Sequence, residues 1–252
     1  MRDLSQQAIA VLLLSLRIAP VFAFAPPFTL VRIPRTISVL LGVAIAAWLV
    51  AAYPGQTWRS PAAPHLIAAA AGELFLGLSI ALALQLAFAA LLTAGRAVDI
   101  QAGFGLAVIA DPTTRGQVPL VGMLFAYAAA IVFFATEGPA HLLAVWAASV
   151  DQVPLGGALL GEGVGTIARF LSAVFVMAFG AAGLLMLVLF LIDLAIAFMS
   201  RTLPQMNVLL LGFQVKTLAL LIVLPIAIAL AGALFLSMIR YALETAALLS
   251  RP

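Results

Sequence analysis

Long runs of apolar residues constrain this chain more than any other feature. A helix needs about 20 mostly apolar residues to cross about 30 Å of hydrocarbon, and six stretches reach or approach that length. They are Leu4–Ala25, Ile37–Tyr53, Leu66–Gly95, Leu120–Ala135, Val164–Met199 and Val208–Ile239. Two shorter apolar pieces, Ile100–Ala110 and Leu142–Val150, are expected to be re-entrant or interfacial segments, or extensions of neighbouring helices. We therefore predict an all-α integral membrane protein with about six long apolar helices, forming a single membrane domain over residues 1–252.

The composition excludes a soluble protein. Apolar residues make up 65% of the chain and charged residues only 8%, whereas a soluble domain carries about 25% charged residues. The scarcity of charge also excludes disorder. The absence of cysteine excludes a disulfide framework and thiolate metal sites. Because the net charge of +3 comes from scattered arginines and the single Lys216, and not from a basic run, no nucleic-acid partner is expected.

The apolar stretches depart from the uniform length of simple membrane spans. Leu66–Gly95 and Val164–Met199 are longer than a bilayer requires. Pro20, Pro119 and Pro225 remove helical hydrogen bonds within or beside the spans. Backbone groups freed at membrane depth are tolerated only where protein or water satisfies them. We therefore expect a chain packed against partner proteins as well as lipid. Its basic residues show no bias toward one side, so the sequence leaves the membrane orientation open.

Three ionisable residues lie inside apolar stretches: Arg17, Glu73 and Asp193. Each costs about 2.5–3.5 kcal/mol on the insertion scale if it faces lipid, so each should face a partner, a neighbouring helix or water. We consider three alternative roles for these residues. The first is structural: an ion pair, or a side chain that reaches the membrane interface from a helix end. The second is a place on a transport pathway, and the third is catalysis.

A polar segment, Ser200–Asn207, separates the last two apolar stretches. Pro204 favours a helix break around Ser200–Leu203. Arg201 follows Asp193 by about 12 Å along a helix, so the two cannot pair directly unless the helix breaks between them. The segment is either a simple turn or a place of subunit contact.

A second segment rich in glycine and polar residues runs from Gly95 to Pro119. Gly103-Phe104-Gly105 is too short for a nucleotide-binding fingerprint, and no strand precedes it. Glycines, polar residues and Asp111-Pro112 between apolar stretches are typical of non-helical backbone that lines or blocks a cavity at membrane depth. A plain surface loop is the alternative.

The sequence gives little support for a catalytic site. No Gly-x-Ser-x-Gly elbow is present. Gly138-Pro139 separates Glu137 from His141 and spoils these two as a pair of metal ligands on one helix face. We therefore expect no enzymatic activity, no catalytic residue, no metal and no cofactor.

Several short motifs together point to a known family. They are Ala25-Pro26-Pro27, Arg32-Ile33-Pro34, Ala87-Phe88-Ala89, Ala94-Gly95, Gln101-Ala102-Gly103, Asp111-Pro112, Asp193, Arg201, Pro204-Gln205-Met206-Asn207, Gly212-Phe213 and Lys216. In this order, and over essentially the whole chain, they resemble the flagellar biosynthesis protein FliR family and its counterparts in virulence type III secretion systems. Three positions depart from the family pattern: Arg96 stands where Glu is common, Pro139-Ala140 separates Gly138 from His141, and Gln214 replaces Pro.

The resemblance implies a structural and gating subunit of the flagellar type III protein-export channel, required for export of flagellar subunits and for flagellum assembly. Family members assemble with FliP-like and FliQ-like membrane subunits into a hetero-oligomeric export-gate cone, and an FlhB-like export switch protein is a further expected partner. Unfolded exported proteins are the implied substrates. The implied location is the bacterial inner membrane, in the flagellar basal body.

Two alternatives stay open. One is the virulence counterpart of the same subunit. The other, from physics alone, is a small-solute secondary transporter with broken helices around Asp193 or the Gly95–Pro119 segment.

The motifs and the resemblance give two candidate sites. The plug or gate loop comprises Gly103, Phe104, Gly105, Asp111 and Pro112. The assembly hinge comprises Asp193, Arg201, Pro204, Gln205, Asn207 and Lys216.

Overall fold

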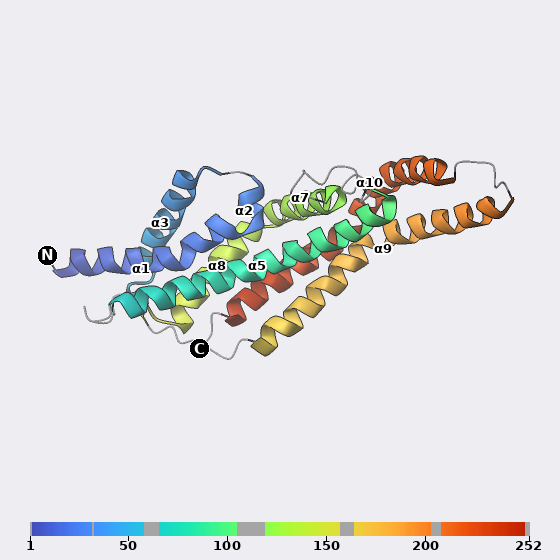
Figure 1. Ribbon diagram of the computed structural model, residues 1–252. Helices are drawn as coiled ribbons and strands as arrows, with labels where there is room; N and C mark the ends of the chain where they lie inside the picture. Colours follow the sequence, from blue (N-terminus) through green and yellow to red (C-terminus); the bar gives the residue numbers. More distant parts are fainter. Residues whose placement is uncertain are drawn as a thin grey trace. The chain divides into compact units, whose positions relative to one another are not determined.

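The computed structural model describes residues 2–31, 33–57, 66–104, 119–156, 164–202 and 208–249, and these residues are almost entirely helical. Figure 1 shows the helices within these ranges: α1 (Arg2–Phe24), α2 (Pro26–Leu30), α3 (Arg35–Ala52), α4 (Pro54–Thr57), α5 (Leu66–Ala102), α7 (Leu120–Ala135), α8 (Gly138–Gln152), α9 (Val164–Thr202) and α10 (Val208–Leu249). The all-α prediction is confirmed, and each of the six predicted apolar stretches forms a helix.

Not all six of these helices are long enough to cross a membrane by themselves. Four are, by length and composition: Ser5–Phe24 in α1, Leu66–Ala102 in α5, Gly165–Thr202 in α9 and Leu210–Leu248 in α10. The consecutive helices α7 and α8 count as a fifth span if a bent pair is accepted, whereas the apolar part of α3, Thr36–Ala52, is shorter. The structure therefore gives four or five candidate spans within the described residues, where the sequence suggested six.

The bend between α7 and α8 follows from three consecutive residues. The two helix axes differ by 72°. Glu137 has a left-handed backbone with φ of 60°, and Pro139 lies in the first turn of α8, where its missing N–H costs nothing. Gly138 lacks a Cβ that would overlap the carbonyl oxygen of Phe133. The predicted apolar piece Leu142–Val150 therefore belongs to a separate helix that turns away from α7.

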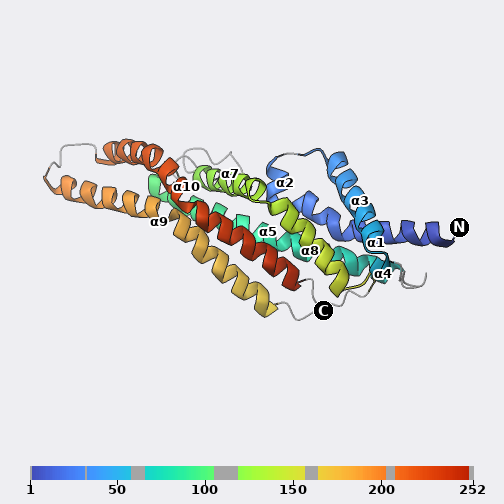
Figure 2. The same cartoon turned by 180° about the vertical axis from the view of Figure 1, so that it is seen from behind.

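The chain divides into two compact units. Unit 1 contains Met1–Ala87, Phe133–Ser172 and Ile239–Pro252, and unit 2 contains Phe88–Val132 and Ala173–Met238. Figure 2 shows the same helices from behind, and α5, α7, α9 and α10 each contribute residues to both units. The single membrane domain over residues 1–252 stays a prediction.

Unit 1 is built around the N-terminal helix. Helix α1 packs against α3 and α2, and both views place α3 beside α1 (Figures 1 and 2). The ring of Phe22 on α1 contacts Phe28 on α2 and Trp146 on α8, with ring centroids 4.7 and 5.7 Å apart. A Cβ on Gly77 of α5 would overlap the carbonyl oxygen of Arg17. The backbones of α1 and α5 are therefore in direct contact, as small residues allow between membrane helices.

Unit 2 is held together in the same way. A Cβ on Gly95 of α5 would overlap the backbone of Gly122 on α7, so these two helices also meet at glycine. Phe125 on α7 contacts Phe235 on α10, with ring centroids 5.9 Å apart. The described core of this unit thus joins helices that are far apart in the sequence.

Candidate functional site

Two residues of the predicted assembly hinge form an ion pair inside unit 2. Asp193 belongs to α9 and Lys216 to α10, and Lys216 Nζ lies 2.5 Å from Asp193 Oδ1. Lys216 Nζ also donates a hydrogen bond of 3.0 Å to the backbone carbonyl oxygen of Gln101 in α5. We call Asp193, Lys216 and Gln101 the Lys216 centre, because this one ammonium group joins three helices.

The Lys216 centre lies at the C-terminal end of α5. The last carbonyl groups of a helix have no partner within the helix and carry partial negative charge, so a cation there is favourable. The Gln101 side chain adds a second link, because its Nε2 donates to the carbonyl oxygen of Met186 on α9, at 3.1 Å. The side chain of Asp193 is 43% exposed and that of Lys216 is 16% exposed.

Gly103 and Phe104, the first two residues of the predicted plug, terminate α5. The Gly103 N–H donates to the Ile100 carbonyl oxygen and the Phe104 N–H to the Asp99 carbonyl oxygen, at 3.1 and 3.0 Å. Gly103 has a φ of 95°, a left-handed conformation that glycine adopts easily. These two hydrogen bonds and the left-handed glycine form a Schellman cap. The Phe104 ring then packs edge-on against Phe213 of α10, with centroids 6.2 Å apart.

Asp99 caps the beginning of the next described helix. Its Oδ1 accepts a hydrogen bond of 3.2 Å from the Val121 N–H in the first turn of α7. The first N–H groups of a helix lack intrahelical partners, and the positive end of the helix dipole favours a carboxylate. Asp99 was part of the polar segment noted in the sequence, but its capping role had no local signal because α7 begins about twenty residues later.

The remaining predicted site residues are less informative. Arg201 lies exposed in the last turn of α9, and α9 ends at Thr202, in agreement with the predicted break around Ser200–Leu203. The plug residues Gly105, Asp111 and Pro112 and the hinge residues Pro204, Gln205 and Asn207 lie outside the described residues. The plug and the assembly contact therefore stay predictions.

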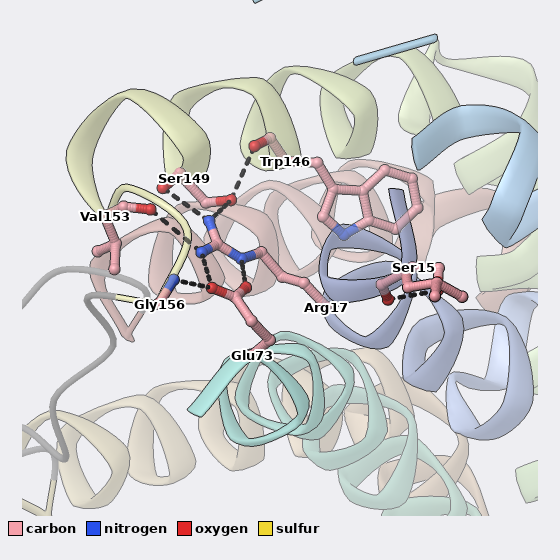
Figure 3. Close-up of polar contacts among 8 residues, drawn as sticks. Ser15, Arg17, Glu73, Trp146, Ser149, Val153 and Gly156 are labelled. Carbon is pink, nitrogen blue, oxygen red and sulfur yellow. Dashed lines mark hydrogen bonds and ion pairs between the residues drawn. The ribbon is translucent and has the colours of Figure 1, made fainter. Parts of the chain in front are cut away.

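The most completely bonded polar group in the described part of the chain lies in unit 1. Arg17 of α1 and Glu73 of α5 are both fully buried and form a two-pronged ion pair (Figure 3). Arg17 Nε donates to Glu73 Oε2 at 2.6 Å, and Arg17 Nη2 donates to Glu73 Oε1 at 3.0 Å. The planar guanidinium thus presents parallel N–H groups to the carboxylate, which is the strong form of this interaction.

The other N–H groups of Arg17 bond the end of α8. Nη1 donates to the carbonyl oxygen and the hydroxyl of Ser149, at 2.9 and 3.1 Å, and Nη2 donates to the Val153 carbonyl oxygen at 3.1 Å. The Gly156 N–H donates to Glu73 Oε1 at 3.0 Å, and the Ser149 hydroxyl donates to the Trp146 carbonyl oxygen at 2.7 Å. A guanidinium has five N–H groups, and these contacts use all of them. We call Arg17, Glu73 and their backbone partners the Arg17 centre (Figure 3).

The sequence predicted that Arg17 and Glu73 each need a partner but could not pair them. They lie 56 residues apart on different helices, and no local pattern connects them. The structure favours the structural ion pair among the alternatives, because both groups are fully buried and bonded to protein.

Two features of the described residues bear on metal and small-molecule binding. No group of three or more His, Cys, Asp or Glu in the described ranges is placed to hold a metal ion. Unit 1 contains two apolar cavities of about 350 and 670 Å³. Their walls, which include Trp48 and Trp146 in the smaller and Phe24 and Leu74 in the larger, carry no ionisable side chain. The described walls of both cavities are therefore largely apolar.

The fold and the two centres define the class: an all-helical integral membrane protein whose ion pairs, within the described residues, bind its own helices together. The chain matches the model of the family "Bacterial export proteins, family 1" over residues 8–242, and it belongs to that family.

Comparison with individual curated proteins gives a more specific similarity than the family match. The chain is similar to the Flagellar biosynthetic protein FliR of Bacillus subtilis (strain 168), with 34% identity over 160 residues that cover 60% of each protein. It is also similar to the protein of the same name from Escherichia coli (strain K12), with 25% identity over 56% of this chain and 54% of the relative. For the protein from Pectobacterium carotovorum subsp. carotovorum, the identity is 26% over 79% of this chain and 76% of the relative. The first two matches span about three fifths or less of the relatives' length.

Proposed function

We propose that this chain is a structural and gating subunit of the flagellar type III protein-export channel, required for export of flagellar subunits and for flagellum assembly. The observation that carries the proposal is the family match over residues 8–242, together with three similar proteins that all bear a flagellar biosynthetic name. The chain acts in the bacterial inner membrane, in the flagellar basal body. Its partners are FliP-like and FliQ-like membrane subunits and an FlhB-like export switch protein, and its substrates are unfolded exported proteins.

The lengths of the helices support a role inside a protein complex. Helix α10 has 42 residues, or about 63 Å, which is twice the hydrocarbon thickness of a bilayer. Only 22% of its most apolar window is buried within the chain, and 28% for α9. This apolar surface is available to lipid and to other apolar chains, and a helix longer than one bilayer crossing leaves part of it for protein partners.

The Lys216 centre supports an assembly role for the hinge. Asp193 is tied to α10 and α5 through Lys216, so this carboxylate serves protein architecture within the chain. Its exposure of 43% leaves part of the carboxylate accessible to a neighbouring subunit. We place the assembly contact at Asp193 and Arg201, together with Pro204, Gln205 and Asn207 beyond the end of α9.

Gating is assigned to the plug, Gly103–Gln117. In sequence, the apolar run Leu106–Ala110 is followed by Asp111-Pro112, and short apolar residues at a constriction exclude water and ions by dewetting. What supports the proposal at its first residues is the Schellman cap at Gly103 and Phe104, which ends α5 at Ala102.

The test is deletion of the gene in its own host, followed by assays of motility and of flagellar subunits secreted into the medium. The proposal expects loss of both, with restoration by the intact gene. It also expects the chain to be unstable or aggregated when produced alone and stable when produced with FliP-like and FliQ-like subunits. A motile deletion strain, or a monodisperse folded single subunit in detergent, would count against it.

Gating has its own test. Deleting Val108–Thr114 should raise ion conductance of cells or liposomes that carry the whole complex, with assembly intact. An assembled complex that remains as tight as the wild type would show that the loop is only a connector.

Two alternatives are distinguished by separate observations. A virulence-system subunit would be encoded beside secretion genes, and its deletion would leave motility intact. A secondary transporter would work as a single gene product and take up a small solute without partners. We also propose that the chain is not an enzyme, which is consistent with the lack of ionisable side chains in the two cavities of unit 1.

A further inference from the structure

We propose that Arg17 is a positioning residue that ends α8 and holds the turn at 153–156, and that its ion pair with Glu73 exists to place it there. The inference goes beyond the proposed function, since it concerns how unit 1 is assembled and not what the complex exports.

The first step is how the N–H groups of the guanidinium are shared between two sets of acceptors. Two of its N–H groups go to Glu73 and three go to Ser149 and Val153 at the end of α8. A pair that served only to neutralise charge between α1 and α5 would need only the first two. The remaining donors must be aimed at backbone carbonyl oxygens, and the planar fork of Arg aims them in fixed directions.

The second step is the nature of these acceptors. Ser149 lies in the last turn of α8 (Gly138–Gln152), and Val153 is its C-terminal cap residue. The terminal carbonyl groups of a helix are normally satisfied by a glycine motif, by water or by a basic side chain of the same helix. The last turn of α8 contains no basic residue. Val153 is buried, whereas Asp151 and Gln152 beside it are exposed. The Ser149 carbonyl already accepts the Val153 N–H at 3.0 Å, so Arg17 adds a second donor to it. At the Val153 carbonyl, beyond the last helical hydrogen bond, Arg17 supplies a donor from another helix.

The third step is the segment after α8. Glu73 Oε1 accepts the Gly156 N–H, so the carboxylate that orients Arg17 also holds the far end of the turn. Between these two contacts, Val153 and Leu155 are 2% and 5% exposed, whereas Pro154 is exposed. The turn is therefore held at both ends by the Arg17 centre and buries alternate side chains.

The proposal predicts that charge neutralisation and turn placement can be separated. In Arg17→Met with Glu73→Met, no buried charge is left, and apolar side chains of similar length fill the space. Such replacements of a buried ion pair are often tolerated. The variant should accumulate, but the Ser149 and Val153 carbonyl groups should lose the Arg17 donors and the turn should detach.

The chain has no cysteine, so single introduced thiols report the turn directly. Leu155→Cys should react slowly with a water-soluble maleimide in the detergent-solubilised complex, and Pro154→Cys should react fast as the exposed control. In the Arg17→Met and Glu73→Met background, the rate at position 155 should rise at least tenfold toward that at position 154. Ser149→Ala is the matched control and should leave position 155 protected, because the carbonyl oxygen of residue 149 still accepts.

Three results would overturn the proposal. They are equal labelling of the two positions in the otherwise unaltered chain, full protection of position 155 in the double-methionine variant, and release by Ser149→Ala. If the double-methionine variant does not accumulate, Arg17→Lys decides the question. Lysine keeps the charge for Glu73 but cannot reach both α8 carbonyl groups, so position 155 should be labelled several-fold faster; unchanged protection there would contradict the proposal. Because labelling reads the turn and not export, its outcome is independent of the proposed function.

Discussion

The Arg17 centre and the Lys216 centre each join three helices through one cation and one carboxylate, yet they differ in burial. Arg17 and Glu73 are fully buried, whereas Lys216 and Asp193 are 16% and 43% exposed. Desolvating a charge is costly, so a fully buried pair is stable only when every group is bonded. A half-exposed pair carries no such requirement. The first centre is therefore closed to other molecules, and the second can still take part in contacts outside the chain.

The comparison predicts its largest effect at Glu73. Glu73→Gln leaves the buried guanidinium without a counter-charge, and breaking a buried pair in this way costs about 3–5 kcal/mol. We expect the chain to be degraded or absent from the export complex, measured by immunoblotting of membranes and of the purified complex. A Glu73→Gln chain that accumulates and assembles normally would show that the two centres do not differ as argued.

A slightly smaller effect is expected where α1 and α5 touch. Gly77→Ala places a Cβ against the Arg17 carbonyl oxygen, so the helices must separate and the Arg17 centre must stretch. Overpacking of this kind costs about 1–3 kcal/mol. The thermal midpoint of the solubilised complex should fall. Gly183→Ala on α9 is the control, because no atom lies within 4 Å of its added Cβ, and a helical Gly→Ala change alone gains about 0.5–1 kcal/mol.

In unit 2, the cap of α5 should be more sensitive than the ion pair beside it. Gly103→Ala forces alanine into a left-handed conformation at φ of 95° and brings its Cβ to 3.2 Å from the Phe213 ring. We expect a loss of about 1–2 kcal/mol, read as a lower thermal midpoint of the complex. If Gly103→Ala behaved like Gly183→Ala, the Schellman cap would have no energetic role.

The smallest effect on stability is expected at Asp193. Asp193→Asn keeps the shape and removes the charge, and a partly exposed ion pair contributes about 0–1 kcal/mol. The thermal midpoint should change little, whereas the fraction of chain that co-purifies with its partners should drop if Asp193 makes an assembly contact. A complex that assembles fully but no longer exports would instead favour an ion-translocating role.

Much of the helical framework was predictable from apolar runs and helix-breaking residues. The segments Glu137-Gly138-Pro139 and Ser200–Leu203 mark helix ends in the sequence, and the structure ends α7 and α9 there. The run Leu66–Gly95 was predicted too short, because α5 continues through Arg96 and Asp99 to Ala102. An apolar run stops at the first charge, whereas the backbone hydrogen bonds of a helix can continue past it.

The polar pairings were not predictable. Arg17 bonds to Glu73, 56 residues away in the sequence, and to Ser149, 132 residues away. Lys216 bonds to Gln101, 115 residues away. Burial cost shows that such residues need partners, but only the packing of the helices determines which partners are in reach. For Asp193, the sequence suggested only Arg201 as a nearby cation, whereas the structure pairs it with Lys216.

The length of α10 has a consequence for hydrophobic matching. A helix needs about 20 residues to cross a bilayer, and α10 has 42, with Pro225 inside it and Lys216, Arg240 and Glu244 toward its two ends. It therefore carries about twice the length of helix that one crossing uses. The thickness of the lipid alone does not fix the position of such a helix, so contacts with protein must do so.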